Sequence, residues 1–177
     1  MRVLELSGGV ATSYAAKLLA DEGADVIKAE PLTGDSLRAS SGSASEKSKP
    51  ENGFLFSGLN VNKRGVAIDY EDKAALSRLL NWADLVVHGL KQRELESLEL
   101  DADLLLEERP HLVVLSITPF GLRGSYSDYS TEEINLVNAG GWANLCPATE
   151  PDPNLPPLKP FGEQSSMMAA ISAAATG

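Results

Sequence analysis

The chain has 177 residues, enough to bury a hydrophobic core in one domain. Its composition is ordinary for a globular protein, and its net charge of -10 at pH 7 argues against a general nucleic-acid partner, which would need a basic surface. No apolar run reaches membrane-spanning length, and residues 1–6 lack the apolar core of a signal peptide, so we expect a cytoplasmic protein with no membrane partner.

The first thirty residues predict a strand–helix–strand unit. Residues 3–6 form an apolar strand, and Thr12 or Ser13 can cap the helix that follows a glycine-containing turn. Gly23 is a natural stop for this helix, and residues 24–28 return as the second strand. The G-x-G-x-x-G fingerprint is absent, so the unit does not predict a dinucleotide site.

Two adjacent cations follow a long polar connection. Residues 31–53 are rich in Ser, Gly, Pro, Lys and Glu, as in a functional flap or a mobile segment. Lys63 and Arg64 then lie in a turn before an alternating strand at 66–69. In an acidic chain such a pair is a candidate anion site, because lysine supplies a point charge and arginine a planar fork for phosphate. The alternative is a solvated edge of the sheet.

Helices and strands continue to alternate through the middle of the chain. Helices are predicted near 71–82, 91–98 and 101–108, with strands at 85–88 and 113–117. This alternation predicts an α/β fold with a mostly parallel sheet and helices on both faces. The last strand is the most apolar, and we expect it inside the sheet rather than at an edge.

The last part of the sequence predicts two helices around a proline-rich loop. Ser130 and Glu133 have capping-box spacing, the loop spans 147–160, and the final helix spans 164–176. This helix is rich in Ala, Ser and Met, so we expect an obligate dimer or a fragmentary fold. Glu163 precedes it, where the helix dipole favours an ionised carboxylate.

Cysteine and histidine are too scarce to define a site. The single cysteine, Cys146, fits a reducing compartment, and the few Cys and His residues do not suffice for a zinc site, so we expect no metal. His88 and His111 flank apolar runs and are interpreted as structural. A thiol enzyme built on Cys146 is a third hypothesis, weakened because the surrounding sequence offers no histidine base.

Segments spread over nearly the whole chain carry a family resemblance. They are residues 2–6, 18–31, 34–38, 59–64, 83–87, 110–113 and 116–121. In order and spacing they resemble the class III CoA-transferase family, also called the carnitine-dehydratase/bile-acid-inducible family, which includes formyl-CoA transferases and α-methylacyl-CoA racemases. The resemblance implies a Rossmann-like large domain that holds CoA. Residues 1–177 would be its N-terminal portion, without the small domain and the C-terminal return segment.

The resemblance also implies which residues and molecules take part. The loop after the first strand, here with Val10 and Ala11, lies around the nucleotide end of CoA in the family. The Asn-x-Asn-Lys-Arg stretch, here with Lys63 and Arg64, lies there too, and Arg38 is a weaker candidate. Coenzyme A or acyl-CoA and a carboxylic acid are then substrates, with no permanently bound cofactor. Family dimers are interlocked rings, so a second copy or a complementary C-terminal half is the expected partner.

Three departures from the family pattern bear on catalysis. The transferases of the family have a catalytic Asp where this chain has Glu163, which moves the carboxylate by about one bond length and lowers the expected efficiency. His88-Gly89-Leu90 replaces Glu-Asn-Phe, and Glu132 and Glu133 replace the His-Asp pair of the racemases. The resemblance therefore favours a CoA-transferase with Glu163 as nucleophile over a racemase. The alternative is a non-catalytic CoA-binding or dimerisation module, or an inactive paralogue.

Overall fold

A five-stranded, all-parallel sheet forms the centre of the protein. The computed structural model describes residues 1–6, 8–39, 53–145, 154 and 159–177. The strand order in the sheet is β3-β2-β1-β4-β5. The strands are β1 (Arg2–Leu6), β2 (Asp25–Pro31), β3 (Arg64–Ile68), β4 (Leu85–His88) and β5 (Val113–Ser116). The predicted strands and the predicted Rossmann-like α/β fold are confirmed.

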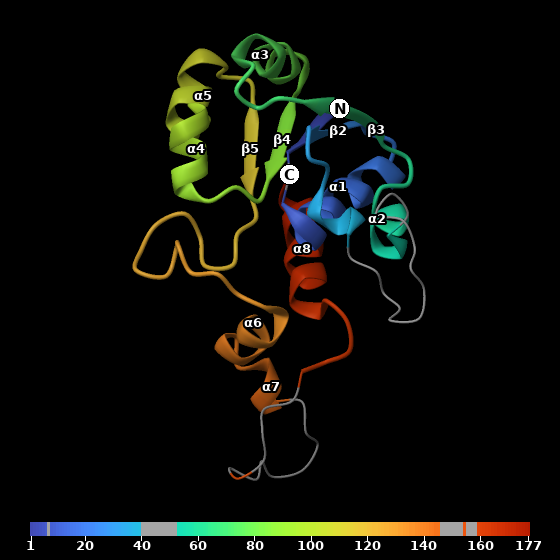
Figure 1. The fold of residues 1–177 in the computed structure, drawn as a ribbon, viewed down its shortest axis with the longest axis vertical. Coiled ribbons are helices and arrows are strands. Elements are labelled where there is room, and N and C mark those ends of the chain that lie inside the picture. The colour runs from blue at the N-terminus through green and yellow to red at the C-terminus, as the bar shows by residue number, and fades with distance from the viewer. Residues whose placement is uncertain (7, 40–52, 146–153, 155–158) are drawn as a thin grey trace.

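Helices connect the strands and cover both faces of the sheet (Figure 1). They are α1 (Gly9–Asp21), the single-turn helix η1 (Ser36–Arg38), α2 (Phe54–Leu59), α3 (Lys73–Trp82), α4 (Gln92–Leu98), α5 (Ala102–Glu108), α6 (Glu133–Ala139), α7 (Trp142–Leu145) and α8 (Gln164–Thr176). α1 and α8 pack together on one face, and α3, α4 and α5 contribute to the core of the other. None of the described helices is long and apolar enough to cross a membrane.

The central strand β1 is buried on both of its faces. Leu4 packs in one core with Leu76 of α3, whereas Val3 belongs to the opposite core with Ala16 of α1 and Ala170 of α8. Neighbouring residues of a strand point to opposite faces, so a strand between two helical layers is apolar along most of its length. The small side chains of α1 and α8 let these two helices approach the sheet and each other closely.

The start of α1 differs from the prediction. The helix begins at Gly9, with Gly8 as N-cap, so Thr12 and Ser13 lie inside it rather than capping it. Gly9 has a φ of 72°, a conformation that glycine adopts without strain. The hydroxyl of Thr12 donates to the carbonyl of Gly8 at 3.2 Å, and that of Ser13 donates to Glu5 at 2.9 Å.

The start of α6 also differs from the prediction. Glu132, not Ser130, is the N-cap residue, and its backbone N–H donates to the side-chain oxygen of Asn135 at 2.9 Å. Glu133 does not close a capping box with Ser130. Its carboxylate instead contacts the beginning of α8.

The expectation that residues 113–117 lie inside the sheet is wrong. Among the described strands β5 pairs with β4 alone, and Val113 is 49% exposed. The strand is apolar because its two faces are covered: Val114 packs against one core and Leu115 against the other. The apolar composition of this strand therefore indicates that helices pack on its two faces, but it does not indicate whether the strand is central or at an edge.

Candidate functional site

A cavity of about 710 Å³ opens at the carboxyl ends of three strands. Gly8 follows β1, Gly89 follows β4 and Ile117 follows β5, and all three line the cavity. From β1 the chain adds β2 and β3 on one side of the sheet and then β4 and β5 on the other, so the direction of strand order reverses between β1 and β4. Parallel α/β sheets bind ligands at such a switch point, outside the carboxyl ends of the strands. The walls are completed by the loop after β5 and by side chains of α6 and α8.

Two glycines make the floor of the cavity. A Cβ atom on Gly89 would lie 2.6 Å from the Cα of Gly8, and one on Gly8 would lie 2.7 Å from the backbone nitrogen of Gly89. Contacts this short do not occur for real side chains, so the loops after β1 and β4 can touch here only because both residues are glycine. A glycine at position 89 thus has a local packing reason.

The first turn of α1 faces the cavity through Val10 and Ala11, both predicted as CoA-binding residues. The N-cap residue, Gly8, has no side chain to cap this turn, and no acidic residue lies in it. The backbone N–H groups at the start of a helix are unsatisfied and carry partial positive charge, so they can hold an anion. Among the described residues that line the cavity, Lys91 is the one with a charged side chain. Its ammonium donates a hydrogen bond to the backbone carbonyl of Asp128 at 3.2 Å.

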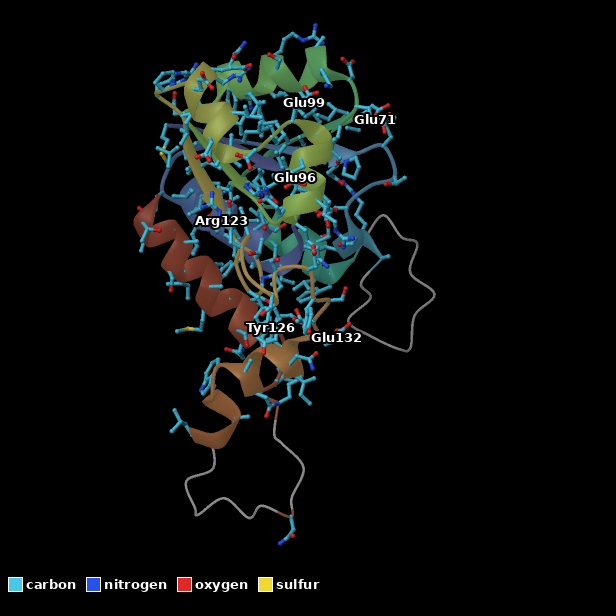
Figure 2. The ribbon with its side chains drawn as sticks, turned by 90° about the vertical axis from the view of Figure 1, so that its left-hand side faces the viewer. Glu71, Glu96, Glu99, Arg123, Tyr126 and Glu132 are labelled. Carbon is cyan, nitrogen blue, oxygen red and sulfur yellow. The ribbon has the colours of Figure 1, made fainter. Side chains whose placement is uncertain are left out.

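An aromatic cluster borders the same cavity. The rings of Phe120 and Tyr126 lie 5.8 Å apart, and those of Tyr126 and Tyr129 lie 5.2 Å apart in an edge-on arrangement. Phe120 and Tyr129 also line a second, mostly apolar hollow of about 670 Å³ beside α6. Figure 2 shows Tyr126 and Glu132 toward the α6 end of the molecule, whereas Glu71 and Glu99 lie toward the opposite end.

Glu163 stands directly before α8, two residues from the cavity-lining Ser165, but does not itself line the cavity. Burial raises the pKa of Glu163, and the negative charge of Glu133 raises it further. Glu133 accepts a hydrogen bond from the backbone N–H of Ser165, and its second oxygen accepts one from the hydroxyl of Ser166 at 3.1 Å. Two carboxyl groups therefore meet at the start of α8.

Lys63 is buried in an ion network beneath α1. Its ammonium donates to Glu5 at 2.7 Å, to the carbonyl of Ser13 at 2.7 Å and to the side chain of Asn60 at 2.9 Å. These three bonds use all three donors of the ammonium. Burial lowers the pKa of Lys63 to about 8, although Glu5 acts in the opposite direction. Glu5 is shared with Lys28, whose ammonium lies 2.6 Å away.

The two predicted arginines lie at different edges of the sheet. Arg64 is the first residue of β3, at the amino edge, where it pairs with Asp25 at 2.7 Å. Arg38 lines a smaller hollow of about 340 Å³ at the carboxyl ends of β2 and β3. It forms two bonds of 2.7 Å with Glu30 and lies 3.8 Å over the ring of Phe56. The structure therefore brings Val10, Ala11 and Arg38 to the carboxyl edge, but not Arg64.

The two histidines have different surroundings. His88 is 2% exposed, and its Nε2 lies 2.8 Å from the hydroxyl of Ser116. Burial lowers its pKa to about 4. His111 is exposed. Among the described residues, no three His, Cys, Asp or Glu side chains gather where they could hold a metal ion. Cys146, the connection at 40–52 and most of the proline-rich loop lie outside the described residues.

Sequence reasoning did not find several residues of the cavity. They are Lys91, Thr118, Phe120, Tyr129, Ser165 and Ser166. They come from segments far apart in the chain, and only the packing of α8 against α1 and the sheet, and of α6 against α8, brings them together. Except for Tyr129, which lies in the connection between β5 and α6, their position just after β4, just after β5 or at the start of a helix was the available signal, because these places converge at one edge of a parallel sheet.

This fold and cavity agree with a known class of proteins. Residues 1–176 match the family described as CoA-transferase family III. The chain belongs to this family, and the resemblance found in the sequence is confirmed.

Two relatives are similar to the chain in amino-acid sequence. The chain is 33% identical over 131 residues to the (R)-2-hydroxy-4-methylpentanoate CoA-transferase of Clostridioides difficile, an alignment covering 72% of this chain and 33% of the relative. It is 34% identical over 158 residues to the succinate–glutarate CoA-transferase of Agrobacterium fabrum, covering 86% of this chain and 39% of the relative. The chain thus spans well under half the length of these relatives.

Solved structures share the fold. A CAIB/BAIF family protein from Brucella suis aligns with a TM-score of 0.77 and 27% identity, over 99% of this chain and 48% of that one. The protein Rv3272 from Mycobacterium tuberculosis aligns with a TM-score of 0.82 and 24% identity, again over 99% of this chain and 48% of that one.

Proposed function

We propose that this chain is part of an enzyme that transfers CoA between an acyl-CoA thioester and a carboxylic acid. The observation that carries the proposal is the cavity at the switch point of a CoA-transferase family III fold. Its volume of about 710 Å³ lies in the range typical of small-molecule sites. Its walls combine apolar side chains with a few hydroxyl groups and one ammonium.

The CoA moiety is proposed to lie along the carboxyl edge of the sheet. The backbone N–H groups at the start of α1, beside Val10 and Ala11, and the ammonium of Lys91 suit its phosphates. Arg38, at the neighbouring hollow, suits another phosphate or the adenine. Contacts from Lys63 and Arg64 would require their ion pairs with Glu5 and Asp25 to open.

The acyl group is proposed to face the aromatic side of the cavity. Phe120 and Tyr129 offer it an apolar wall that continues into the adjacent hollow. The names of the relatives point to small organic acids as partners, among them 2-hydroxy-4-methylpentanoate, succinate and glutarate. Thioesters of such acids are therefore the first substrates to test.

Glu163 is proposed as the nucleophile. Its carboxylate attacks the thioester carbonyl, CoA leaves as thiolate, and a mixed anhydride forms. The thiolate then attacks the Glu163 carbonyl of the anhydride, which releases the first acid and leaves a Glu163–CoA thioester. The acceptor carboxylate attacks this thioester, expels CoA thiolate and forms a second mixed anhydride with Glu163. The thiolate then attacks the acceptor's carbonyl carbon, which breaks the anhydride, releases the new acyl-CoA and frees the Glu163 carboxylate. Such covalent catalysis divides one difficult exchange into easier steps.

A non-catalytic CoA-binding module is the second candidate. It is favoured by the position of Glu163 outside the cavity lining and by Glu133, which occupies the donors at the start of α8. In a transferase these donors would be available to stabilise an oxyanion. The two candidates differ in whether Glu163 ever becomes covalently modified.

Trapping separates the two candidates. The protein is incubated with succinyl-CoA and labelled glutarate, treated with hydroxylamine or borohydride, and digested for mass spectrometry. A transferase should transfer the label and carry the modification on Glu163. The Glu163→Gln variant should not be modified at this position. The matched control, Glu132→Gln, should still be modified on Glu163. Exchange with an unmodified Glu163 would refute its role. Binding of CoA without exchange, over a panel of acyl-CoA thioesters, would favour the non-catalytic module.

We also propose a cytoplasmic protein that assembles with a second copy of itself or with a complementary segment. Met168 and Ile171 on α8 and Phe161 before it are exposed, although all three are large and apolar. Exposed apolar side chains grouped on one element are typical of an interaction surface.

A further inference from the structure

The first turn of α8 is held by a carboxylate from another helix. Glu133 begins α6, is 5% exposed, and accepts bonds from the backbone N–H of Ser165 and the hydroxyl of Ser166. Glu163, the N-cap residue of α8, makes no capping bond with its own side chain. A helix start leaves several N–H groups without partners and favours a nearby negative charge. Glu133 supplies that charge in place of the residue next to the helix.

This contact links the cavity wall to Glu163. Ser165 and Ser166 both line the cavity, and Glu163 belongs to the same turn of chain. An interaction that holds Ser165 and Ser166 in place therefore also restricts the positions open to the Glu163 side chain. The hydroxyl oxygen of Ser165 is also buried in this turn.

The pKa values of the Glu133 and Glu163 carboxyl groups are shifted in opposite directions. Burial acts to raise the pKa of Glu133, but the hydrogen bonds from Ser165 and Ser166 outweigh it and lower the pKa overall. For Glu163, burial and the charge of Glu133 both raise the pKa. Among the described residues, two other charged groups act on Glu163: Glu132, the N-cap residue of α6, adds to the rise, and Lys159 of the preceding loop opposes it. The ammonium of Lys159 is held at 2.7 Å by the carbonyl of Gly162.

We infer that Glu133 is a positioning residue for Glu163: it fastens the turn that carries Glu163 to the cavity wall and presents a like charge to it. The inference rests on the proposed function only in treating Glu163 as the nucleophile. It gives Glu133 a role on α8, whereas its place in the sequence suggested a cap for its own helix and, through the resemblance, the position of the racemases' His-Asp pair.

The electrical part is tested by following the Glu163 carboxyl carbon through a pH titration by NMR. In Glu133→Gln the midpoint of Glu163 should fall, because a nearby like charge that raises the pKa of Glu163 is removed. Glu132→Gln is the matched control and should shift it less. An unchanged midpoint in Glu133→Gln, or equal shifts in both variants, would overturn the inference.

The fastening part is tested by amide hydrogen exchange at Ser165. Glu133→Ala should exchange about tenfold faster, because it removes a charged acceptor from this N–H. Glu133→Gln keeps a carbonyl oxygen there and should retain most of the protection. Ser166→Ala removes one of the two donors alone and should have an intermediate effect. Exchange as slow in Glu133→Ala as in the unaltered protein would overturn this part.

These results are independent of the transferase assay. A shifted Glu163 midpoint without any CoA exchange would support the role of Glu133 while the proposed function fails. Exchange with Glu163 modified, but with a midpoint insensitive to Glu133→Gln, would support the proposed function and overturn the role of Glu133.

Discussion

The ammonium of Lys63 is enclosed by the carboxylate of Glu5, the carbonyl of Ser13 and the amide oxygen of Asn60. Next to it in the chain, Arg64 forms an exposed pair with Asp25. Adjacent cations thus have opposite environments, because successive residues at the beginning of a strand point in different directions. A buried ion pair is strongly coupled to the fold, whereas an exposed one contributes little.

Replacement of these two cations should therefore have unequal effects on stability. Lys63→Met leaves Glu5 with one cation fewer in a buried site and should lower the free energy of unfolding by about 3–5 kcal/mol. Arg64→Ala, the matched control, should lower it by less than about 1 kcal/mol. Urea unfolding followed by circular dichroism measures both. Equal, small losses would show that the Lys63 network is not required for folding.

His88 should make stability depend on acid pH. Its pKa is lowered from 6.5 to about 4 by burial, so between these values the unfolded chain binds a proton that the folded chain does not. The contribution of His88 to the free energy of unfolding is therefore fully present above pH 6.5. It is lost as the pH falls toward 4, and this loss amounts to at most about 3 kcal/mol. Unfolding of His88→Gln, measured across the same window, should show a shallower slope. Parallel slopes for the two proteins would exclude His88 as the cause.

At the scale of elements, alternation and composition predicted most of what the structure contains. The five strands, α3, α4, α5 and α8 were found because apolar spacing records which faces are buried. The start of α1 was misplaced because Thr12 and Ser13 have the chemistry of caps but are used inside the helix. Their actual partners, Gly8 and Glu5, depend on how the loop and sheet pack, which local sequence does not record.

The contact between Gly8 and Gly89 ties the beginning of α1 to the end of β4. Gly89→Ala would place a methyl group 2.6 Å from the Gly8 Cα and should force these loops apart, at a cost of about 1–3 kcal/mol in stability. It should also weaken CoA binding, because the loops form the cavity floor. Gly65→Ala, where added atoms meet nothing within 4 Å, is the control. Calorimetry and urea unfolding that fail to distinguish the two variants would count against this geometry.

At the scale of the whole molecule, the order of strands decides where the cavity lies. Sequence patterns predicted a parallel sheet but could not give its order, since apolar strands look alike whether central or at an edge. β5 was misassigned to the interior for that reason. The same limit applies to the candidate site: Val10, Ala11 and Glu163 could be proposed from a resemblance. Lys91, the aromatic cluster and the link from Glu133 to α8 required the assembled fold.

Self-association is the expected behaviour of the chain in solution. The exposed apolar residues of α8, and the edge of β5 that pairs with no strand in the described part of the chain, are unfavourable in water and can pair with another chain. Multi-angle light scattering should give a mass above that of one chain. Met168→Lys together with Ile171→Lys should lower it. A monodisperse, stable monomer of the 177-residue chain would contradict this expectation.

Mapping of CoA onto the chain by NMR tests the central claim most directly. Titration with CoA should give saturable shifts of the backbone amides that surround the cavity, namely Val10, Ala11, Gly89, Lys91 and Thr118. Lys91→Gln should weaken the response to CoA more than the response to pantetheine, which lacks the phosphates. Shifts confined to the amino edge of the sheet around Arg64, or no saturable shifts at all, would contradict a CoA site at the switch point.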